Sequence, residues 1–332
     1  KVRKEGGRRA IGFNFIANMD VMEGLQQLSD RSVNCCITSP PYWGLRDYGV
    51  DGQIGLEQTP DEYVTKMVRV FREVKRVLRD DGTLWLNLGD SYCGTGDKSG
   101  LRDPKYAKGR TGQDTAINSR INGFKPKDLV GIPWRVAFAL QADGWYLRQD
   151  IIWHKPNPMP ESVTDRCTKA HEYIFLLARS QRYYYDNEAV REEGCGRLDR
   201  GPQSAGRLGS GGRQFIDGAP DLEESNGRNR RSVWTVATKP YSGAHFATFP
   251  PDLIRPCILA GCPKDGVVLD PFMGSGTTAV VALQEGRQYV GIELNSKYVE
   301  LAEQRIQEWV NSQPKEMPIE KYIQREEGVI SH

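Results

Sequence analysis

Apolar residues follow two spacings along this chain, and the alternation between them predicts strands and helices that follow one another. Five apolar runs have the length and β-branched content of buried strands: residues 11–16, 32–37, 83–88, 145–153 and 266–269. Apolar residues recur at helical spacing in five other segments: residues 21–28, 59–79, 128–142, 252–260 and 296–309. This order predicts an α/β fold built on an open sheet.

Local signals set several element boundaries. Thr59, Pro60 and Glu62 together predict a helix start, with threonine as N-cap and glutamate completing a capping box. Residues 80–82 (Asp-Asp-Gly) predict the end of that helix before the strand at 83–88. Residues 172–177 and 182–185 are expected to form an antiparallel pair, and Ser296 is expected to cap the last helix.

Two long segments lack any periodic pattern. Residues 91–127 are rich in glycine and carry more basic than acidic side chains, which suits either a mobile loop that closes over a polyanion or a solvated insert. Residues 186–231 are rich in glycine, arginine, serine and asparagine, and are read as a recognition segment or as a linker. The basic residues 1–10 are expected to form a disordered tail that can also contact phosphates.

Composition narrows the class of protein. The 332 residues suffice for one large domain or two small ones, and the net charge of +2 requires any nucleic-acid binding to come from local patches. We find no transmembrane run and no signal peptide, and therefore expect an intracellular protein that does not bind membranes. The seven cysteines contain no C-x-x-C pair, so we expect reduced thiols and no metal site.

Residues 38–43 (Thr-Ser-Pro-Pro-Tyr-Trp) form the first candidate site. Pro40 and Pro41 end the strand before them because neither has an N–H to donate. The carbonyl groups of Ser39 and Pro40 then remain free at the carboxyl end of a strand, where open α/β sheets bind ligands. With Tyr42 as an aromatic plate, they suit a flat heterocycle that bears an exocyclic amine. The alternative is a rigid turn whose aromatic residues belong to the core.

Two aspartates follow other predicted strands. Asp90 comes after the strand at 83–88, on the same sheet edge as Ser39, where its carboxylate can take a proton from an amine or instead cap a turn. Asp20 lies at a strand-to-helix turn, where it can accept hydrogen bonds from a ligand or serve as a plain helix N-cap.

The clearest unit is a strand, a glycine turn, a helix and a second strand near the C-terminus. Asp270 precedes the turn, Gly274 and Gly276 allow the backbone to approach a ligand, and Glu293 ends the second strand, where it can accept both ribose hydroxyls. The unit lacks a Walker lysine and a full G-x-G-x-x-G. An adenosyl group carrying a sulfonium and an amino-acid tail therefore fits it better than a dinucleotide.

These motifs resemble those of the DNA amino-methyltransferases. Residues 272–276 (Phe-Met-Gly-Ser-Gly) are similar to the family's S-adenosylmethionine motif, residues 38–42 to its catalytic motif, and their order to its β class. The resemblance spans about residues 17–307. It implies a Rossmann-like S-adenosylmethionine-dependent methyltransferase fold with a mixed seven-stranded sheet and a circularly permuted motif order. It further implies a catalytic half at 11–185, a target-recognition segment at 186–231 and a cofactor-binding half at 232–312.

The resemblance also implies roles for individual residues. Ser39 and the Pro40 carbonyl would accept the two hydrogens of an exocyclic amine, Tyr42 would stack on a base flipped out of double-stranded DNA, and Asp90 would relay the proton. Residues 245–250 resemble the segment that contacts the methionine part of the cofactor. The residues expected to bind S-adenosyl-L-methionine are Asp20, Thr38, His245, Thr248, Phe249, Asp270, Phe272, Gly274, Ser275, Gly276, Thr277 and Glu293.

The target base is the finer question. Serine at the first motif position resembles the N4-cytosine enzymes, whereas aspartate or asparagine is more typical of N6-adenine enzymes, so N4 of cytosine is expected and N6 of adenine is the alternative. A non-catalytic recognition subunit of the same fold and an RNA substrate are kept as further alternatives. Cys257 follows a proline, as carbon-5 nucleophiles do, but it lies in a helix far from the motif and is rejected. A second copy of the chain and a restriction endonuclease are the further partners considered.

Overall fold

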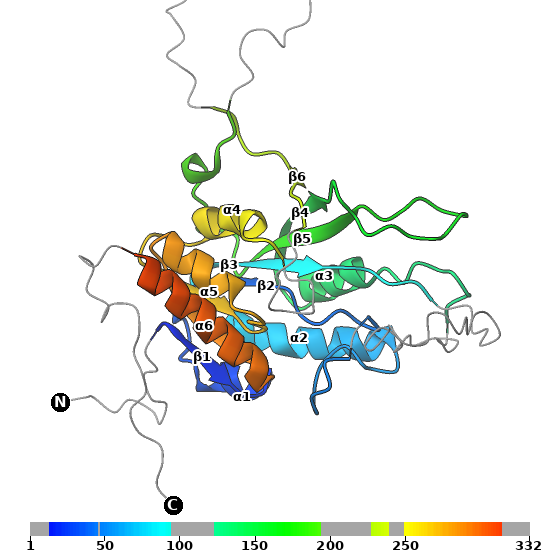
Figure 1. Ribbon diagram of the computed structural model, residues 1–332, viewed down its shortest axis with the longest axis horizontal. Coiled ribbons are helices and arrows are strands. Elements are labelled where there is room, and N and C mark those ends of the chain that lie inside the picture. Colours follow the sequence, from blue (N-terminus) through cyan, green and yellow to red (C-terminus); the bar gives the residue numbers. More distant parts are fainter. Residues whose placement is uncertain (1–12, 46, 94–122, 194–226, 239–248, 314–332) are drawn as a thin grey trace, which may run out of the picture.

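One twisted sheet runs through the molecule (Figure 1). The computed structural model describes residues 13–45, 47–93, 123–193, 227–238 and 249–313. Within these residues the sheet has eight strands in the order β1-β8-β7-β2-β3-β5-β4-β6. The strands are β1 (Phe15–Asn18), β2 (Val33–Thr38), β3 (Leu78–Leu88), β4 (Tyr146–His154), β5 (His171–Ala178), β6 (Val233–Thr235), β7 (Val267–Asp270) and β8 (Gln288–Glu293).

Strand direction decides which residues meet. β5 pairs antiparallel with both β3 and β4, and every other neighbouring pair is parallel. The carboxyl ends of the parallel strands therefore share one edge of the sheet with the amino end of β5. The chain leaves β2 and β7 toward opposite sides of the sheet, so this adjacent pair forms the topological switch point where such sheets bind ligands.

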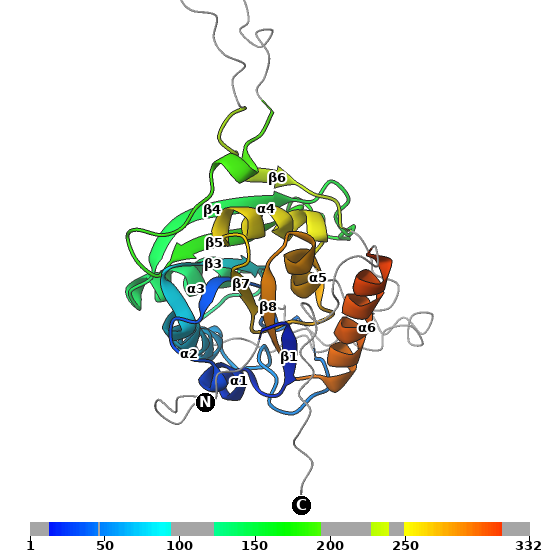
Figure 2. The same ribbon diagram turned by 90° about the vertical axis from the view of Figure 1, so that its left-hand side faces the viewer.

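Helices cover both faces of the sheet (Figure 2). The elements α1 (Val21–Gln27), α2 (Pro60–Val77) and α3 (Ile132–Ala142) cover one face, and α4 (Pro251–Gly261), α5 (Thr277–Gln284) and α6 (Ser296–Ser312) cover the other. A short 3₁₀ helix, η1 (Glu188–Val190), packs near α4. No helix within the described residues is both long and apolar enough to cross a membrane.

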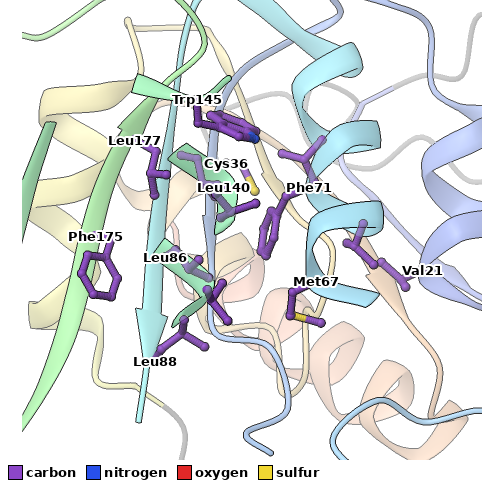
Figure 3. Close-up of a cluster of buried hydrophobic side chains, with 14 of the residues drawn as sticks. Val21, Cys36, Met67, Phe71, Leu86, Leu88, Leu140, Trp145, Phe175 and Leu177 are labelled. Atoms are coloured by element: carbon purple, nitrogen blue, oxygen red, sulfur yellow. The ribbon is translucent and has the colours of Figure 1, made fainter. Parts of the chain in front are cut away.

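Two hydrophobic layers hold these helices on the sheet. In the layer under α2 and α3, Phe71 and Leu140 point from the helices toward Leu86 and Cys36 on the strands (Figure 3). Each of these four side chains is fully buried. Full burial of one such side chain contributes about 1.5–3 kcal/mol. The layer therefore fixes the strand ends that carry the candidate site.

The capping signals at α2 are confirmed in full. The Thr59 hydroxyl accepts from Glu62 N at 3.2 Å, and the Glu62 carboxylate accepts from Thr59 N at 3.4 Å, which closes the expected capping box. The predicted helix end at residues 80–82 is wrong, because α2 ends at Val77 and β3 already begins at Leu78. Pairing explains the difference: Val33 of β2 pairs with Leu78, and Gly82 O and Asp81 O accept from Arg179 N and Tyr184 N.

Three further boundaries differ from the expectation. Residues 182–185 form no strand, because β3 and β4 occupy both sides of β5. The helix expected from residue 128 begins at Ile132, since residues 128–130 bond the backbone of residues 91–93. Asn295 caps α6 in place of Ser296, and its side chain accepts from Lys297 N.

The expected α/β fold with a mixed sheet is confirmed, and β6 adds an eighth strand to the seven expected. β6 pairs with β4 at the outer edge, where Ile152 lies opposite Val233. Most of the two aperiodic segments, residues 94–122 and 194–226, lies outside the described residues, as do residues 1–12.

Candidate functional site

The candidate residues from five strands come together at one edge of the sheet. Ser39 follows β2, Asp90 follows β3 and Asp270 ends β7. Glu293 ends β8, and Asp20 follows β1 in the turn before α1. The two motifs lie more than 200 residues apart in the sequence, but β2 and β7 are hydrogen-bonded neighbours. The fold thus places the proline motif beside the glycine turn.

A buried hydrogen bond joins the two motifs directly. The Thr38 hydroxyl donates to Asp270 Oδ1 at 2.6 Å, and the Thr278 hydroxyl donates to Asp270 Oδ2 at the same distance. Phe272 N also donates to Oδ1, at 3.0 Å. Burial raises the pKa of Asp270 to about 6, although these three donors act in the opposite direction. Asp270 is only 1 % exposed, so its carboxylate holds the turn in shape rather than facing solvent.

The glycine turn needs its glycines for two different reasons. Gly276 has a φ of +81°, and a Cβ there would lie 2.7 Å from the Cβ of Ala302, so it lets α5 approach α6 closely. Gly274 has a φ of +52°, and a Cβ there would meet no atom closer than Phe272 O at 3.9 Å. Open space beside Gly274 allows a ligand to approach the backbone, as the sequence predicts.

Two carboxylates end the neighbouring strands. Glu293 accepts from Gly274 N and from Asn295 N, both at 2.8 Å, and burial raises its pKa. Asp20 accepts from Met22 N and Glu23 N through one oxygen, which is the N-cap geometry considered as its alternative role. A carboxylate oxygen has two lone pairs, so both residues keep acceptor capacity for ribose or adenine groups.

Ser275 and Thr277 face the protein interior. Arg305 of α6 donates to Ser275 O, Ser275 Oγ and Thr277 Oγ1 at 2.5, 2.9 and 3.2 Å. Both side chains are buried, at 1 % and 4 % exposure. The sequence did not point to Arg305. It lies on α6, about 30 residues after the glycine turn, so no short motif links it to that turn. The guanidinium thus holds the turn against α6 through one backbone carbonyl and two side-chain hydroxyls.

These residues fit S-adenosyl-L-methionine, judged by the open face of Gly274 and the carboxylates around it. A helix N-terminus, a close backbone approach and acids at two strand ends suit an adenosyl group with a charged tail. Phe272 and Phe249 are half-buried beside the two hydrophobic layers. His245 and Thr248 lie outside the described residues.

The proline motif forms a rigid loop. Pro40 is buried, and the Pro41 carbonyl accepts from the hydroxyl of Tyr63 at 2.9 Å. Trp43 is buried, and its indole N–H donates to Glu57 O at 2.9 Å. Within the described part of the chain, no donor reaches the Pro40 carbonyl oxygen. That acceptor and the half-buried Ser39 hydroxyl lie in sequence next to each other at the end of β2.

Tyr42 is held by Ser39 and by two polar residues that the sequence did not point to, Glu172 and Asn87. Its hydroxyl accepts from Ser39 Oγ at 3.2 Å and donates to Glu172 Oε2 at 2.7 Å. Asn87 Oδ1 lies 3.1 Å from the same hydroxyl, and Lys155 forms an ion pair with Glu172. Burial, followed by the charge of Glu172, raises the pKa of Tyr42 well above its ordinary value.

Glu172 was missed because its strand direction is a tertiary property. It lies at the amino end of β5, and only the antiparallel direction of β5 brings it to the edge that carries Ser39. Asn87 offered a weak signal, since it is the one amide within the apolar run of residues 83–88. It is 4 % exposed and donates to Tyr173 O at 3.0 Å.

Asp90 anchors the start of α3. Its Oδ1 accepts from Ser91 N, Gly131 N and Ile132 N at 2.9–3.0 Å. This carboxylate at a helix N-terminus is the capping role considered as the alternative to proton transfer. Among the contacts of the described residues, none joins Asp90 to Ser39.

Other chemistries find less support in the described residues. Cys257 is 1 % exposed in α4, and burial raises its pKa far above the ordinary value, which disfavours the reactive thiolate. Within residues 13–45, 47–93, 123–193, 227–238 and 249–313, no three His, Cys, Asp or Glu side chains gather as metal ligands. The geometry is suited to holding an amine-bearing heterocycle beside a nucleotide-like cofactor.

Comparison with known proteins supports the same conclusion. A family model described as DNA methylase, of the N6/N4 type, matches residues 33–304. The chain is 53 % identical to the type II methyltransferase M.Cfr9I of Citrobacter freundii, over 87 % of this chain and 86 % of that protein. It is 50 % identical to M.SmaI of Serratia marcescens, over 86 % and 88 %.

Solved structures share the fold. The cytosine-N4-specific PvuII DNA methyltransferase aligns with a TM-score of 0.60 at 18 % identity, covering 94 % of this chain and 91 % of that one. The Thermus thermophilus protein TTHA0409, complexed with S-adenosyl-L-methionine, aligns with a TM-score of 0.58 at 22 % identity, covering 90 % of this chain and 95 % of that one. The sheet and helices described above are therefore the methyltransferase fold expected from the sequence.

Proposed function

This chain belongs to the N6/N4 DNA methylase family and uses S-adenosyl-L-methionine as its cofactor, and on that premise we propose that it methylates N4 of cytosine in double-stranded DNA. The cofactor supplies an electrophilic methyl group on a sulfonium. The residues of the chain supply the binding, the orientation and the acceptors for the protons of the target amine.

One observation carries the proposal: the 2.6 Å hydrogen bond from Thr38 to Asp270. Ser39 follows Thr38 directly, and the glycine turn follows Asp270, so this bond ties the acceptors for the amine to the binding site for the methyl donor. Thr38 and Asp270 end β2 and β7, and the parallel pairing of these two strands keeps the two motifs adjacent. Such fixed placement of two reactants accounts for a large share of the catalysis in our mechanism.

The mechanism follows from the lone pair of an exocyclic amine, which is delocalised into the ring. Acceptance of its two hydrogens by Ser39 Oγ and the Pro40 carbonyl favours a tetrahedral nitrogen that can attack a methyl group. The target base must leave the duplex to reach this buried edge, and we propose that Tyr42 stacks on it there. Tyr42 is half-buried, and the tight contact with Gly89 fixes its ring.

Serine at position 39 supports cytosine over adenine. A hydroxyl can donate to or accept from the ring nitrogen beside the amine, whereas a carboxylate can only accept. The half-buried Ser39 hydroxyl donates to the Tyr42 hydroxyl, so its lone pairs remain to accept, and rotation of the O–H away from Tyr42 would let it donate to the ring nitrogen.

The wider setting is also proposed. Several relatives are named as type II methyltransferases of bacteria and archaea, so we propose that this enzyme modifies a specific site inside the cell and is paired with a restriction endonuclease. We propose that residues 186–231 recognise the target DNA sequence. The catalytic half at residues 11–185 and the cofactor-binding half at residues 232–312 are likewise proposed. A homodimer remains a prediction.

The test is mass spectrometry of nucleosides from unmethylated genomic DNA incubated with the protein and S-adenosylmethionine. We expect N4-methylcytosine, and a Ser39→Ala variant should lose it. N6-methyladenine would overturn the choice of base while leaving the fold and cofactor in place. Absence of any methylated base, with cofactor still bound, would contradict the enzymatic assignment and favour a non-catalytic recognition subunit.

A further inference from the structure

A continuous run of hydrogen bonds leads from Ser39 away from the site of methyl transfer. Ser39 Oγ donates to Tyr42 Oη at 3.2 Å, and Tyr42 Oη donates to Glu172 Oε2 at 2.7 Å. Tyr42 has one hydroxyl hydrogen, and the shorter contact to a charged acceptor orients it toward Glu172 rather than toward Asn87. Ser39 thereby keeps its lone pairs free to accept from an amine.

We propose that Ser39, Tyr42 and Glu172 form a proton relay that carries the proton released by the methylated amine to the Glu172 carboxylate. The inference rests on the proposed function, because it requires methyl transfer to an exocyclic amine. It does not depend on whether the amine belongs to cytosine or adenine. Ser39 and Tyr42 both contact the target base in the proposed mechanism, while Glu172 acts through them.

The step balances as follows. The nitrogen lone pair forms the N–CH₃ bond while the S–CH₃ bond breaks. The electron pair of the broken S–CH₃ bond stays on the sulfur, which becomes a neutral thioether. The nitrogen, now cationic, gives one proton to Ser39 Oγ. Ser39 passes its own proton to Tyr42 Oη, and Tyr42 passes its own to Glu172, which ends as a neutral acid. A methylated exocyclic ammonium is a strong acid, so a carboxylate suffices as the final acceptor.

The surroundings of Tyr42 suit a relay. A residue that both accepts and donates must keep its hydroxyl protonated, and the raised pKa of Tyr42 ensures that across the neutral range. A Cβ at Gly89 would lie 2.5 Å from the Tyr42 ring, so the ring sits directly on this glycine. Asn87 Nδ2 donates to Glu172 Oε2 at 3.3 Å and steadies the carboxylate.

Glu172 lies among cationic and titratable groups on neighbouring elements. Lys155 follows β4 and forms the ion pair with Glu172, while Lys169 precedes β5 and His171 begins it; the charge of Glu172 acts on both. Tyr42 is the acidic group that faces Glu172 from the proline loop. The Glu172 side chain is 17 % exposed, so an accepted proton can pass on to solvent.

The central test compares Glu172→Gln and Tyr42→Phe with the wild-type protein in single-turnover methyl transfer. Glutamine keeps an acceptor for Tyr42 but takes up no proton. We expect each variant to lose about 100-fold in rate. The double variant should lose no more than either single one, because the residues act as one unit.

Binding readouts separate proton transfer from a structural role. The Kd for S-adenosylhomocysteine, the Kd for substrate DNA and the fluorescence of 2-aminopurine placed at the target base should stay within about twofold of wild type. Glu161→Gln is the matched control, because Glu161 lies in the connection that leads from β4 to the strand of Glu172 and pairs with Arg166. It should methylate at the wild-type rate.

The outcomes for the relay and for the proposed function are distinct. Absence of methylation by the wild-type protein on every DNA tested would contradict the proposed function. A wild-type rate of methylation in Glu172→Gln, or additive losses in the double variant, would overturn the relay alone. Loss of cofactor binding or of the 2-aminopurine signal in Glu172→Gln would assign the residue a structural role instead.

Discussion

Asp270 shows at the scale of a single residue how the site retains a buried charge. Its two oxygens receive three hydrogen bonds, yet removal from water still raises its pKa from the ordinary 3.8 to about 6. That difference corresponds to about 3 kcal/mol between the protonated and the charged forms. Burial of the Asp270 carboxylate therefore has a cost in stability at neutral pH, and the hydrogen bond from Thr38, which joins the two motifs, offsets part of that cost.

A stability prediction follows from this pKa. Between pH 4 and 6 the native chain holds the Asp270 proton while the unfolded chain has lost it, so the free energy of unfolding falls as the pH rises. Asp270→Asn should remove this slope. The stability of wild type relative to Asp270→Asn should thus decline by about 3 kcal/mol from below pH 4 to above pH 6, measured by urea unfolding.

The control for this measurement is Asp61→Asn, because the Asp61 side chain is 90 % exposed. Its free energy of unfolding should stay within about 0.5 kcal/mol of wild type, because substitutions at exposed positions have small effects. A stability difference for Asp270→Asn that rises or stays flat with pH would contradict the assigned ionisation.

At the scale of an element, α3 depends on a carboxylate supplied by another strand. Gly131 occupies the N-cap position and has no side chain to cap the helix, so Asp90 accepts from Gly131 N and Ile132 N instead. The helix covers the sheet through buried residues such as Val136 and Leu140. The loop after β3 is thereby tied to the packing of α3.

Asp90→Ala should lower the free energy of unfolding by about 1 kcal/mol, whereas Asp90→Asn, which keeps an acceptor, should lose less than half as much. Chemical denaturation of both variants measures the capping. Single-turnover rates of Asp90→Asn and Glu172→Gln then decide which carboxylate receives the proton. The relay through Tyr42 requires the larger loss in Glu172→Gln, and the opposite order would support the Asp90 relay expected from the sequence.

At the scale of the molecule, one sheet carries both motifs. The hydrophobic layers on its two faces share the central strands: Cys36 of β2 faces one layer and Cys35 the other. Neither the catalytic nor the cofactor motif has a core of its own, and residues of β2, β3, β7 and β8 contribute to both layers. Cofactor binding should therefore stabilise the whole fold rather than one half.

We expect a single unfolding transition, and S-adenosylhomocysteine at 100 times its Kd should stabilise the protein by about 2.7 kcal/mol. Far-ultraviolet circular dichroism and tryptophan fluorescence should agree with each other on the midpoint without the ligand. They should also agree on the higher midpoint with the ligand. Gly276→Ala should abolish the shift, because the added Cβ both meets Ala302 and strains a φ of +81°. Two separate transitions, only one of them shifted by ligand, would contradict a shared core.

Much of the fold could be predicted from local pattern. The capping box at Thr59 and Glu62, the proline stop after β2 and the glycine turn after β7 are local signals, and each lies where the pattern placed it. The errors lie where distant backbone groups decide the conformation. Residues 80–82 have turn residues but join β3, because β2 and the segment after β5 supply hydrogen-bond partners.

The sequence by itself determined where these strands end and which residues stand at their ends, because prolines, glycines and helix caps act on the backbone next to them. Those residues include Ser39, Asp90, Asp270 and Glu293, each placed at an edge without knowledge of its partners. Only the tertiary structure decided what these side chains face. Strand order set Thr38 against Asp270, and the reversed direction of β5 brought Glu172 to Tyr42. Such contacts join residues over 100 positions apart, and no local spacing encodes them.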